Sequence, residues 1–200
     1  MRIIVVGATG TIGTPLSAAL AERHEVVRVG NRHGDFQVDV ADHGSVARLF
    51  QDIGPFDALV SLAGGARFKP IGELTDEDFA FSLSHKLMGQ INLVRAGLAH
   101  VRDGGSFTLT SGVLAQEPMP GSSAISLVNA GVEGFARAAA LDMPRGVRIN
   151  VVSPPWVTET LQGMGWDTSP GMPAAQVARV YIECIEGSRN GEILDARDFG

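Results

Sequence analysis

MRIIVVGATGTIG, residues 1–13, opens the chain with a short apolar run followed at once by three spaced glycines. The run Arg2–Val6 is rich in β-branched residues and predicts a strand, and Thr14–Arg23 predicts a helix. Between them, Gly7 permits a tight turn, Gly10 lets the backbone approach a pyrophosphate, and Gly13 lets the helix pack closely on the strand. A plain strand-to-helix turn is the alternative, but this context favours a phosphate-binding turn at the helix N-terminus. Its expected members are Gly7, Thr9, Gly10, Thr11, Ile12 and Gly13.

The rest of the chain alternates short β-branched runs with longer Ala- and Leu-rich stretches. This alternation predicts an α/β fold, namely a Rossmann-type, doubly wound parallel sheet of about seven strands between two layers of helices. The expected strands are Arg2–Val6, Glu25–Gly30, Phe36–Val38, Asp57–Ser61, Ser106–Thr110, Val147–Val152 and Glu192–Leu194. The expected helices are Thr14–Arg23, His43–Ile53, Thr75–Val101, Ser122–Met143 and Ala174–Glu186. Ser153–Pro173 contains four prolines and is expected to form a loop or lid.

Composition limits the classes of protein to consider. A chain of 200 residues fits one domain, residues 1–200, and the net charge of −6 argues against a nucleic-acid partner. Cys184 is the only cysteine, so a disulfide framework is excluded and a reducing, cytoplasmic compartment is expected. No apolar run approaches the ~20 residues of a membrane helix. The five histidines lack the spacing of a zinc site, so no metal is expected.

The end of the second expected strand indicates which nicotinamide cofactor is bound. NAD-selective sites place an acid there for the ribose 2′-hydroxyl, whereas this chain has Asn31 and Arg32. A guanidinium can make charge-assisted hydrogen bonds to a 2′-phosphate, worth ~1.5–3 kcal/mol. We therefore expect NADP, with NAD possible if Asp35, three residues after Arg32, serves as a ribose ligand.

Further motifs resemble the short-chain dehydrogenase/reductase family over almost the full length of the chain. Asp39-Val40 resembles the family's adenine-contacting acid, and Leu62-Ala63-Gly64 its Asn-Ala-Gly segment with the first residue changed. Thr110-Ser111 resembles the end of its fifth strand with the catalytic serine, and Pro155–Thr158 its cofactor-capping loop. The resemblance implies a homodimer or homotetramer and further cofactor contacts from Asp39, Val40, Ala63, Gly64, Pro154, Trp156 and Val157.

The chain departs from this family where the chemistry takes place. The family uses a Tyr-x-x-x-Lys pair, in which the lysine lowers the pKa of a proton-donating tyrosine. Here the two positions are Ile125 and Asn129, and the only tyrosine, Tyr181, is expected to pack in the last helix. Ser111 lies 14 residues before Ile125, about one more than is usual for the family. Gly112 and Thr110 are therefore alternative candidates for the position of the family's serine.

Lys86 is the candidate replacement for the missing tyrosine. Lys86-Leu87-Met88-Gly89 resembles the family's Asn-x-x-Gly, so lysine stands at the asparagine position and Asn129 at the lysine position. If the fold is kept, Lys86, Ser111 and Asn129 converge near the nicotinamide ribose. A partly buried Lys86 would have a lowered pKa and act as the proton donor. The alternative is a surface lysine that only orders the site.

Other residues have simpler interpretations. Trp156 and Trp166 border the proline-rich loop and either line a substrate pocket or anchor a lid. Ser122 is expected to cap the helix that it begins, and Cys184 to be a buried small residue.

Together these observations predict an NADP-dependent oxidoreductase of the short-chain type that acts on a small carbonyl or alcohol with an unusual proton donor. Two alternatives stay open. The chain could bind NADP(H) without catalysis, as a sensor or partner subunit, or it could be a non-redox lyase or isomerase with Lys86 as the base.

Overall fold

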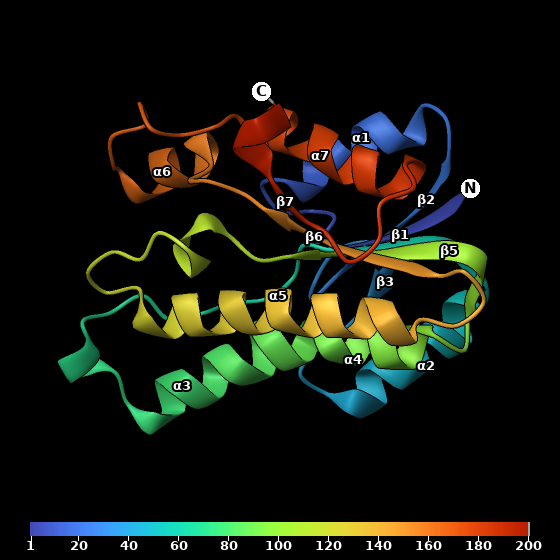
Figure 1. The fold of residues 1–200 in the computed structure, drawn as a ribbon, viewed down its shortest axis with the longest axis horizontal. Coiled ribbons are helices and arrows are strands. Elements are labelled where there is room, and N and C mark those ends of the chain that lie inside the picture. The colour runs from blue at the N-terminus through green and yellow to red at the C-terminus, as the bar shows by residue number, and fades with distance from the viewer. Residues whose placement is uncertain (200) are drawn as a thin grey trace.

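A seven-stranded parallel sheet forms the centre of the computed structural model, which describes residues 1–199 (Figure 1). The strand order is β3-β2-β1-β4-β5-β6-β7, so the chain reverses its direction across the sheet between β1 and β4. The strands are β1 Arg2–Val6, β2 Glu25–Gly30, β3 Phe36–Gln37, β4 Phe56–Ser61, β5 Val101–Thr110, β6 Arg148–Ser153 and β7 Ile193–Asp195. This is the doubly wound Rossmann-type arrangement, which confirms the predicted fold class.

Helices cover both faces of the sheet. α2, α4 and α5 lie on one face, and α1, α6 and α7 lie on the other (Figure 1). The helices are α1 Gly13–Ala21, α2 His43–Ile53, α3 Asp76–Ser82, α4 Gly89–Gly97, α5 Ser123–Asp142, α6 Thr158–Met164 and α7 Ala174–Glu186. Short helical turns are η1 Ile71–Glu73, the π-helical η2 Leu83–Met88, η3 Val113–Ala115 and η4 Ala196–Phe199. None of the described helices is long and apolar enough to cross a bilayer.

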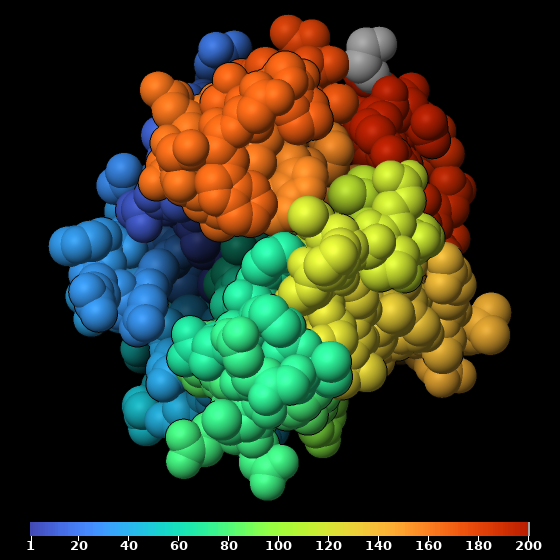
Figure 2. All heavy atoms as spheres, turned by 90° about the vertical axis from the view of Figure 1, so that its left-hand side faces the viewer, coloured from blue at the N-terminus to red at the C-terminus, as the bar shows by residue number. Residues whose placement is uncertain are grey.

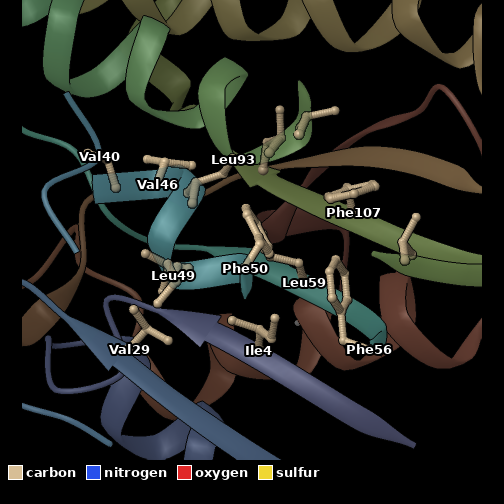
Figure 3. Packing of buried hydrophobic residues seen from close by; sticks show 14 of the residues in the cluster. Ile4, Val29, Val40, Val46, Leu49, Phe50, Phe56, Leu59, Leu93 and Phe107 are labelled. Atoms are coloured by element: carbon tan, nitrogen blue, oxygen red, sulfur yellow. The ribbon is translucent and has the colours of Figure 1, made fainter. Parts of the chain in front are cut away.

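The central parts of the strands are mostly apolar and buried because both faces of the sheet are covered. Under α2 and α4, Phe50 packs on Phe56, and Phe56 meets Phe107 edge to face with ring centroids 6.0 Å apart (Figure 3). A second buried cluster on the opposite face includes Leu16 and Tyr181. The two cores hold the carboxyl ends of the strands in place. The glycine turn between β1 and α1 and two cavities lie at this carboxyl edge of the sheet.

The helix expected over Thr75–Val101 is divided into three parts. It begins as predicted at a capping box between Thr75 and Asp78, but η2 inserts a π-helical turn and α4 ends at Gly97. A Cβ at Gly97 would lie 2.9 Å from the Phe107 ring, so glycine allows the helix end to lie close to the sheet. β5 then starts at Val101 rather than at the predicted Ser106.

Two smaller predictions were wrong. The Ser153–Pro173 segment is not all loop, because it contains α6, which ends at Gly165 in the left-handed conformation. Ser122 precedes α5 without a side-chain cap; its hydroxyl instead accepts hydrogen bonds from the Met119 backbone N–H and from Ser126. Proline at the edges of a segment therefore did not exclude a short helix within it.

Candidate cofactor cleft and active site

The turn between β1 and α1 is compact because glycines replace side chains at its contacts. Gly7 has φ +90°, and its N–H donates to the Val29 carbonyl over 2.8 Å. A Cβ at Gly13 would lie 2.1 Å from the Gly7 carbonyl oxygen, and the Gly10 N–H bonds to the same oxygen over 3.0 Å. The turn thus brings bare backbone to the N-terminus of α1, where a pyrophosphate is favoured by free N–H groups and the helix dipole.

A cavity of about 320 Å³ lies beside this turn. Figure 2 shows the molecule hollowed between the blue β2–β3 region, the orange α6 region and the blue-green segment that follows β4. The Asp39 carboxylate lines the cavity and accepts a hydrogen bond from the Ala41 N–H. The lining includes six of the expected cofactor contacts: Gly7, Asn31, Asp39, Val40, Ala63 and Gly64. A glycine turn that leads into a cleft with an acid at its far end fits an adenine dinucleotide.

Asp35 is engaged away from this cleft. Its carboxylate accepts hydrogen bonds from the Arg28 backbone N–H at 2.9 Å and from the Arg28 guanidinium at 3.0 Å. The guanidinium also holds the pKa of Asp35 below its usual range. Arg32 lies exposed on the turn after β2, and its carbonyl accepts a hydrogen bond from the Gln37 side chain. Asp35, the alternative ribose ligand, is therefore paired with the guanidinium of Arg28.

A second cavity of about 330 Å³ adjoins the cleft, since Gly64 lines both. Lys86, Ser111 and Asn129 all line it, so the structure brings the three predicted active-site residues together. Four more of the predicted cofactor contacts, Ile12, Pro154, Trp156 and Val157, also line it. Thr9 lines a groove on the outer side of the turn, and Thr11 is exposed.

Lys86 is the only residue with a charged side chain in the lining of this second cavity. It lies on the π-helical turn η2, and a Cβ at Gly64 would be 2.9 Å from the Lys86 Cα, so the two backbones are in close contact. The Nζ donates to the Ser111 carbonyl at 3.4 Å, a long hydrogen bond. Burial lowers the pKa of Lys86 to about 8, because removing the ammonium group from water disfavours its charged form.

Gln90 fixes the relation between this turn and the end of β5. It is fully buried one helical turn after Lys86, and its amide donates to the Lys86 carbonyl at 3.1 Å and to the Thr110 carbonyl at 2.9 Å. The Thr110 N–H donates back to the Gln90 side chain at 2.8 Å. The Gln90 amide therefore links η2 to the end of β5, on the two sides of the cavity. This role was not predicted from the sequence.

Ser111 does not point its hydroxyl hydrogen into the cavity. The hydroxyl donates to the carboxylate of Glu133 at 2.9 Å, and the Gln116 side chain donates to the other oxygen. Glu133 is 3% exposed and lies four residues after Asn129, on the same side of α5. That spacing is the signal by which the sequence could have identified it.

Thr110 and Gly112 are the two other candidates for the position of the family's catalytic serine. The Thr110 hydroxyl is turned into the core, where it bonds the Ser61 carbonyl at 2.6 Å and the Tyr181 hydroxyl at 2.8 Å. Gly112 faces the cavity beside Asn129, whose amide donates to the Gly112 carbonyl at 3.4 Å. Tyr181 is fully buried, and burial raises its pKa, so it is a packing residue as predicted.

A family model described as "Enoyl-(Acyl carrier protein) reductase" matches residues 10–185 of the chain. With the fold and the glycine turn described above, this match shows that the chain belongs to the short-chain dehydrogenase/reductase family. The family predicted from the sequence motifs is thereby confirmed.

Individual relatives are similar over much of the chain. The protein lin1944 from Listeria innocua is 38% identical, with a TM-score of 0.94 and 98% of both chains covered. A small-chain dehydrogenase solved in complex with NADPH has a TM-score of 0.86 at 24% identity over 98% of this chain and 95% of that one, which shows a common fold. The Hydroxynaphthalene reductase-like protein Arp2 of Metarhizium brunneum is 30% identical over 76% of this chain. The chain spans 61% of the length of that protein.

Proposed function

We propose that the protein is an NADP(H)-dependent oxidoreductase that reduces a small carbonyl compound, with Lys86 as the proton donor. The observation that carries this proposal is the position of Lys86, the single charged side chain lining the cavity that adjoins the dinucleotide cleft. When a reduced nicotinamide is bound in the cleft, it supplies the hydride for the carbonyl carbon. The residues of the chain then have to bind the substrate oxygen, supply one proton and limit water.

NADP is proposed over NAD because of the charges at the end of β2. Arg32 is exposed there and Asp35 is paired with Arg28, so a 2′-phosphate would meet a guanidinium and no free carboxylate from this turn. The short-chain relative crystallised with NADPH is consistent with this choice.

Proton transfer is assigned to the Lys86 ammonium group. With a pKa of about 8, it is mostly protonated at pH 7, so it can donate a hydrogen bond to a carbonyl oxygen. As hydride adds to the carbon, negative charge develops on that oxygen, and Lys86 transfers its proton to give the alcohol. The neutral amine is then reprotonated from solvent.

Neighbouring residues have supporting roles in this proposal. The Asn129 amide holds the Gly112 carbonyl, and Ile125, at the family's tyrosine position, adds an apolar wall that limits water. Ser111 gives its hydrogen to Glu133, so its oxygen can accept a hydrogen bond from the hydroxyl of the alcohol product but has no proton free to donate to the carbonyl.

A second candidate is a protein that binds NADP(H) without redox catalysis. Two observations favour it: isoleucine at the tyrosine position, and the engagement of the Ser111 hydroxyl by Glu133. The two candidates separate when NADPH oxidation is followed with a panel of carbonyl compounds for the native protein, Lys86→Ala and Ser111→Ala. Tight NADPH binding with no oxidation of any compound supports the non-catalytic binder. Turnover that Lys86→Ala leaves unchanged rules out the lysine donor.

A further inference from the structure

Three aromatic side chains from three segments pack together beside the second cavity, which one of them, Trp156, lines. Phe68 follows β4, Trp156 follows β6, and Trp166 follows α6. The ring centroids of Trp156 and Trp166 are 5.6 Å apart, and Phe68 lies edge to face with both at 6.3 and 6.2 Å. In Figure 2 the blue-green and orange segments that carry these residues meet beside the hollow. We call these three residues the aromatic cluster.

Trp156 belongs to both the aromatic cluster and the cavity lining. Around it the lining is apolar, with contributions from Val113, Leu114, Ile125, Pro155 and Val157. Only Lys86, Asn129 and a few hydroxyl residues are polar in that lining. The site therefore combines one proton-donating polar group with a largely apolar surface that includes an indole ring.

The segment from Trp156 to Ala174, which contains α6, does not depend on the aromatic cluster for its attachment. The Thr158 N–H donates to the Met172 carbonyl at 3.0 Å, and the Met172 N–H donates to the Trp156 carbonyl at 2.8 Å. The Glu159 carboxylate accepts from the Ala174 N–H at the start of α7, at 2.9 Å. These hydrogen bonds fix both ends of the segment, yet Trp166 stays 45% exposed and Phe68 37% exposed. Large apolar groups that are left this exposed at a cavity mouth are typical of a ligand-binding surface.

We infer that the substrate of the proposed reductase is an aromatic ring ketone, with its ring on Trp156 and its carbonyl oxygen at Lys86. This inference rests on the proposed function and narrows its substrate class. An aromatic ring gains edge or stacking contacts with indole beyond the burial of its area, whereas a saturated ring of the same size gains burial alone. Trp156 then determines the choice of substrate, and Phe68 and Trp166 support it from the outer side.

The test compares 2-tetralone with 2-decalone, two bicyclic ketones of similar size of which only the first contains an aromatic ring. With NADPH as the reductant, we expect kcat/KM for 2-tetralone to be about three- to tenfold higher, the range that an aromatic pair supplies. Trp156→Ala removes this preference, and Trp156→Phe keeps most of it. Met164→Ala, an exposed site on α6 outside the cavity lining, keeps it in full.

A binding measurement separates this inference from the proposed function. The only two tryptophans of the chain are both in the aromatic cluster, so Trp166→Phe leaves Trp156 as the sole indole reporter. In the presence of NADP⁺, we expect 2-tetralone to quench the fluorescence of Trp156. We expect 2-decalone to change that fluorescence only at higher concentration. Quenching without turnover of either ketone would refute the redox function and leave the inference standing. Turnover with equal kcat/KM for both ketones, or a preference that Trp156→Ala does not change, would overturn the inference alone.

Discussion

Replacing Lys86 with methionine should remove activity and at the same time stabilise the protein. Methionine keeps most of the apolar stem but has no proton to give. A general acid contributes typically ~10²–10⁴-fold, and we expect kcat/KM for NADPH-dependent reduction to fall by that factor. Loss of activity through unfolding would be accompanied by lower stability, so the two effects can be told apart.

The gain in stability follows from the cost of holding a cation in the cavity. The pKa of Lys86 is lowered from 10.5 to about 8, a difference of about 2.5 units, or ~3 kcal/mol at 1.36 kcal/mol per unit. Because the side chain is only partly buried and solvent screens part of this cost, we expect methionine to gain about 1–3 kcal/mol at pH 7. The gain is complete below pH 8, declines as pH rises from about 8 to 10.5, and is absent above that range, where both folded and unfolded lysine are neutral.

The assay is thermal unfolding at pH 7 and at pH 11, run beside steady-state kinetics. For a chain of this size, each kcal/mol shifts Tm by roughly 2–4 °C. Lys69→Met is the matched control, because Lys69 is the only other lysine, and its exposed side chain pairs with Asp78. It should leave turnover unchanged. A Lys86→Met variant with activity within about threefold of the native protein, or with a lower Tm at pH 7, would refute this reasoning.

Four further predictions follow from the site. Gly13→Ala should raise the Kd for NADPH more than about tenfold in calorimetry, because the new Cβ would lie 2.1 Å from the Gly7 oxygen; native-like affinity would contradict the compact turn. Arg32→Ala should weaken NADPH binding by roughly ten- to a hundredfold and leave NADH binding nearly unchanged, whereas equal losses would argue against a 2′-phosphate contact. Glu133→Ala should lower the free energy of unfolding in urea by about 1–3 kcal/mol, because the buried Ser111 hydroxyl loses its acceptor. The rate of reduction should fall as pH rises through about 8, because only protonated Lys86 can donate; a profile that is flat from pH 6 to 10 would exclude Lys86 as the acid.

The fold could be predicted from the sequence because its signals are local. The glycine turn and the alternation of β-branched runs with Ala-rich stretches each depend on neighbouring residues, and β1, α2 and α7 were predicted with the bounds that the structure has. The break in the expected helix Thr75–Val101 has a tertiary cause, since η2 packs against Gly64 and the helix ends against Phe107. Nothing in the periodicity of that segment reports such contacts.

Three members of the candidate site were predicted, but Gln90, Glu133 and the direction of the Ser111 hydroxyl were not. Lys86, Ser111 and Asn129 line one cavity because the parallel strands end at one edge of the sheet and α5 passes beside it. The direction of the Ser111 hydroxyl depends on Glu133, 22 residues away, and on Gln116. The engagement of Asp35 by Arg28 likewise depends on how the turn after β2 folds back. Side-chain pairs of this kind leave only weak signals in a single sequence.

Isothermal titration of the purified protein with NADPH, and then with NADH, tests the central claim that the backbone from Gly7 to Gly13 holds the pyrophosphate of a dinucleotide. We predict one NADPH bound per chain, with a Kd at least about tenfold below that for NADH, a ratio set by the charge-assisted contact to the 2′-phosphate. Absence of binding heat with both nucleotides, at chain concentrations well above the expected Kd, would contradict the cofactor site and every role assigned from it.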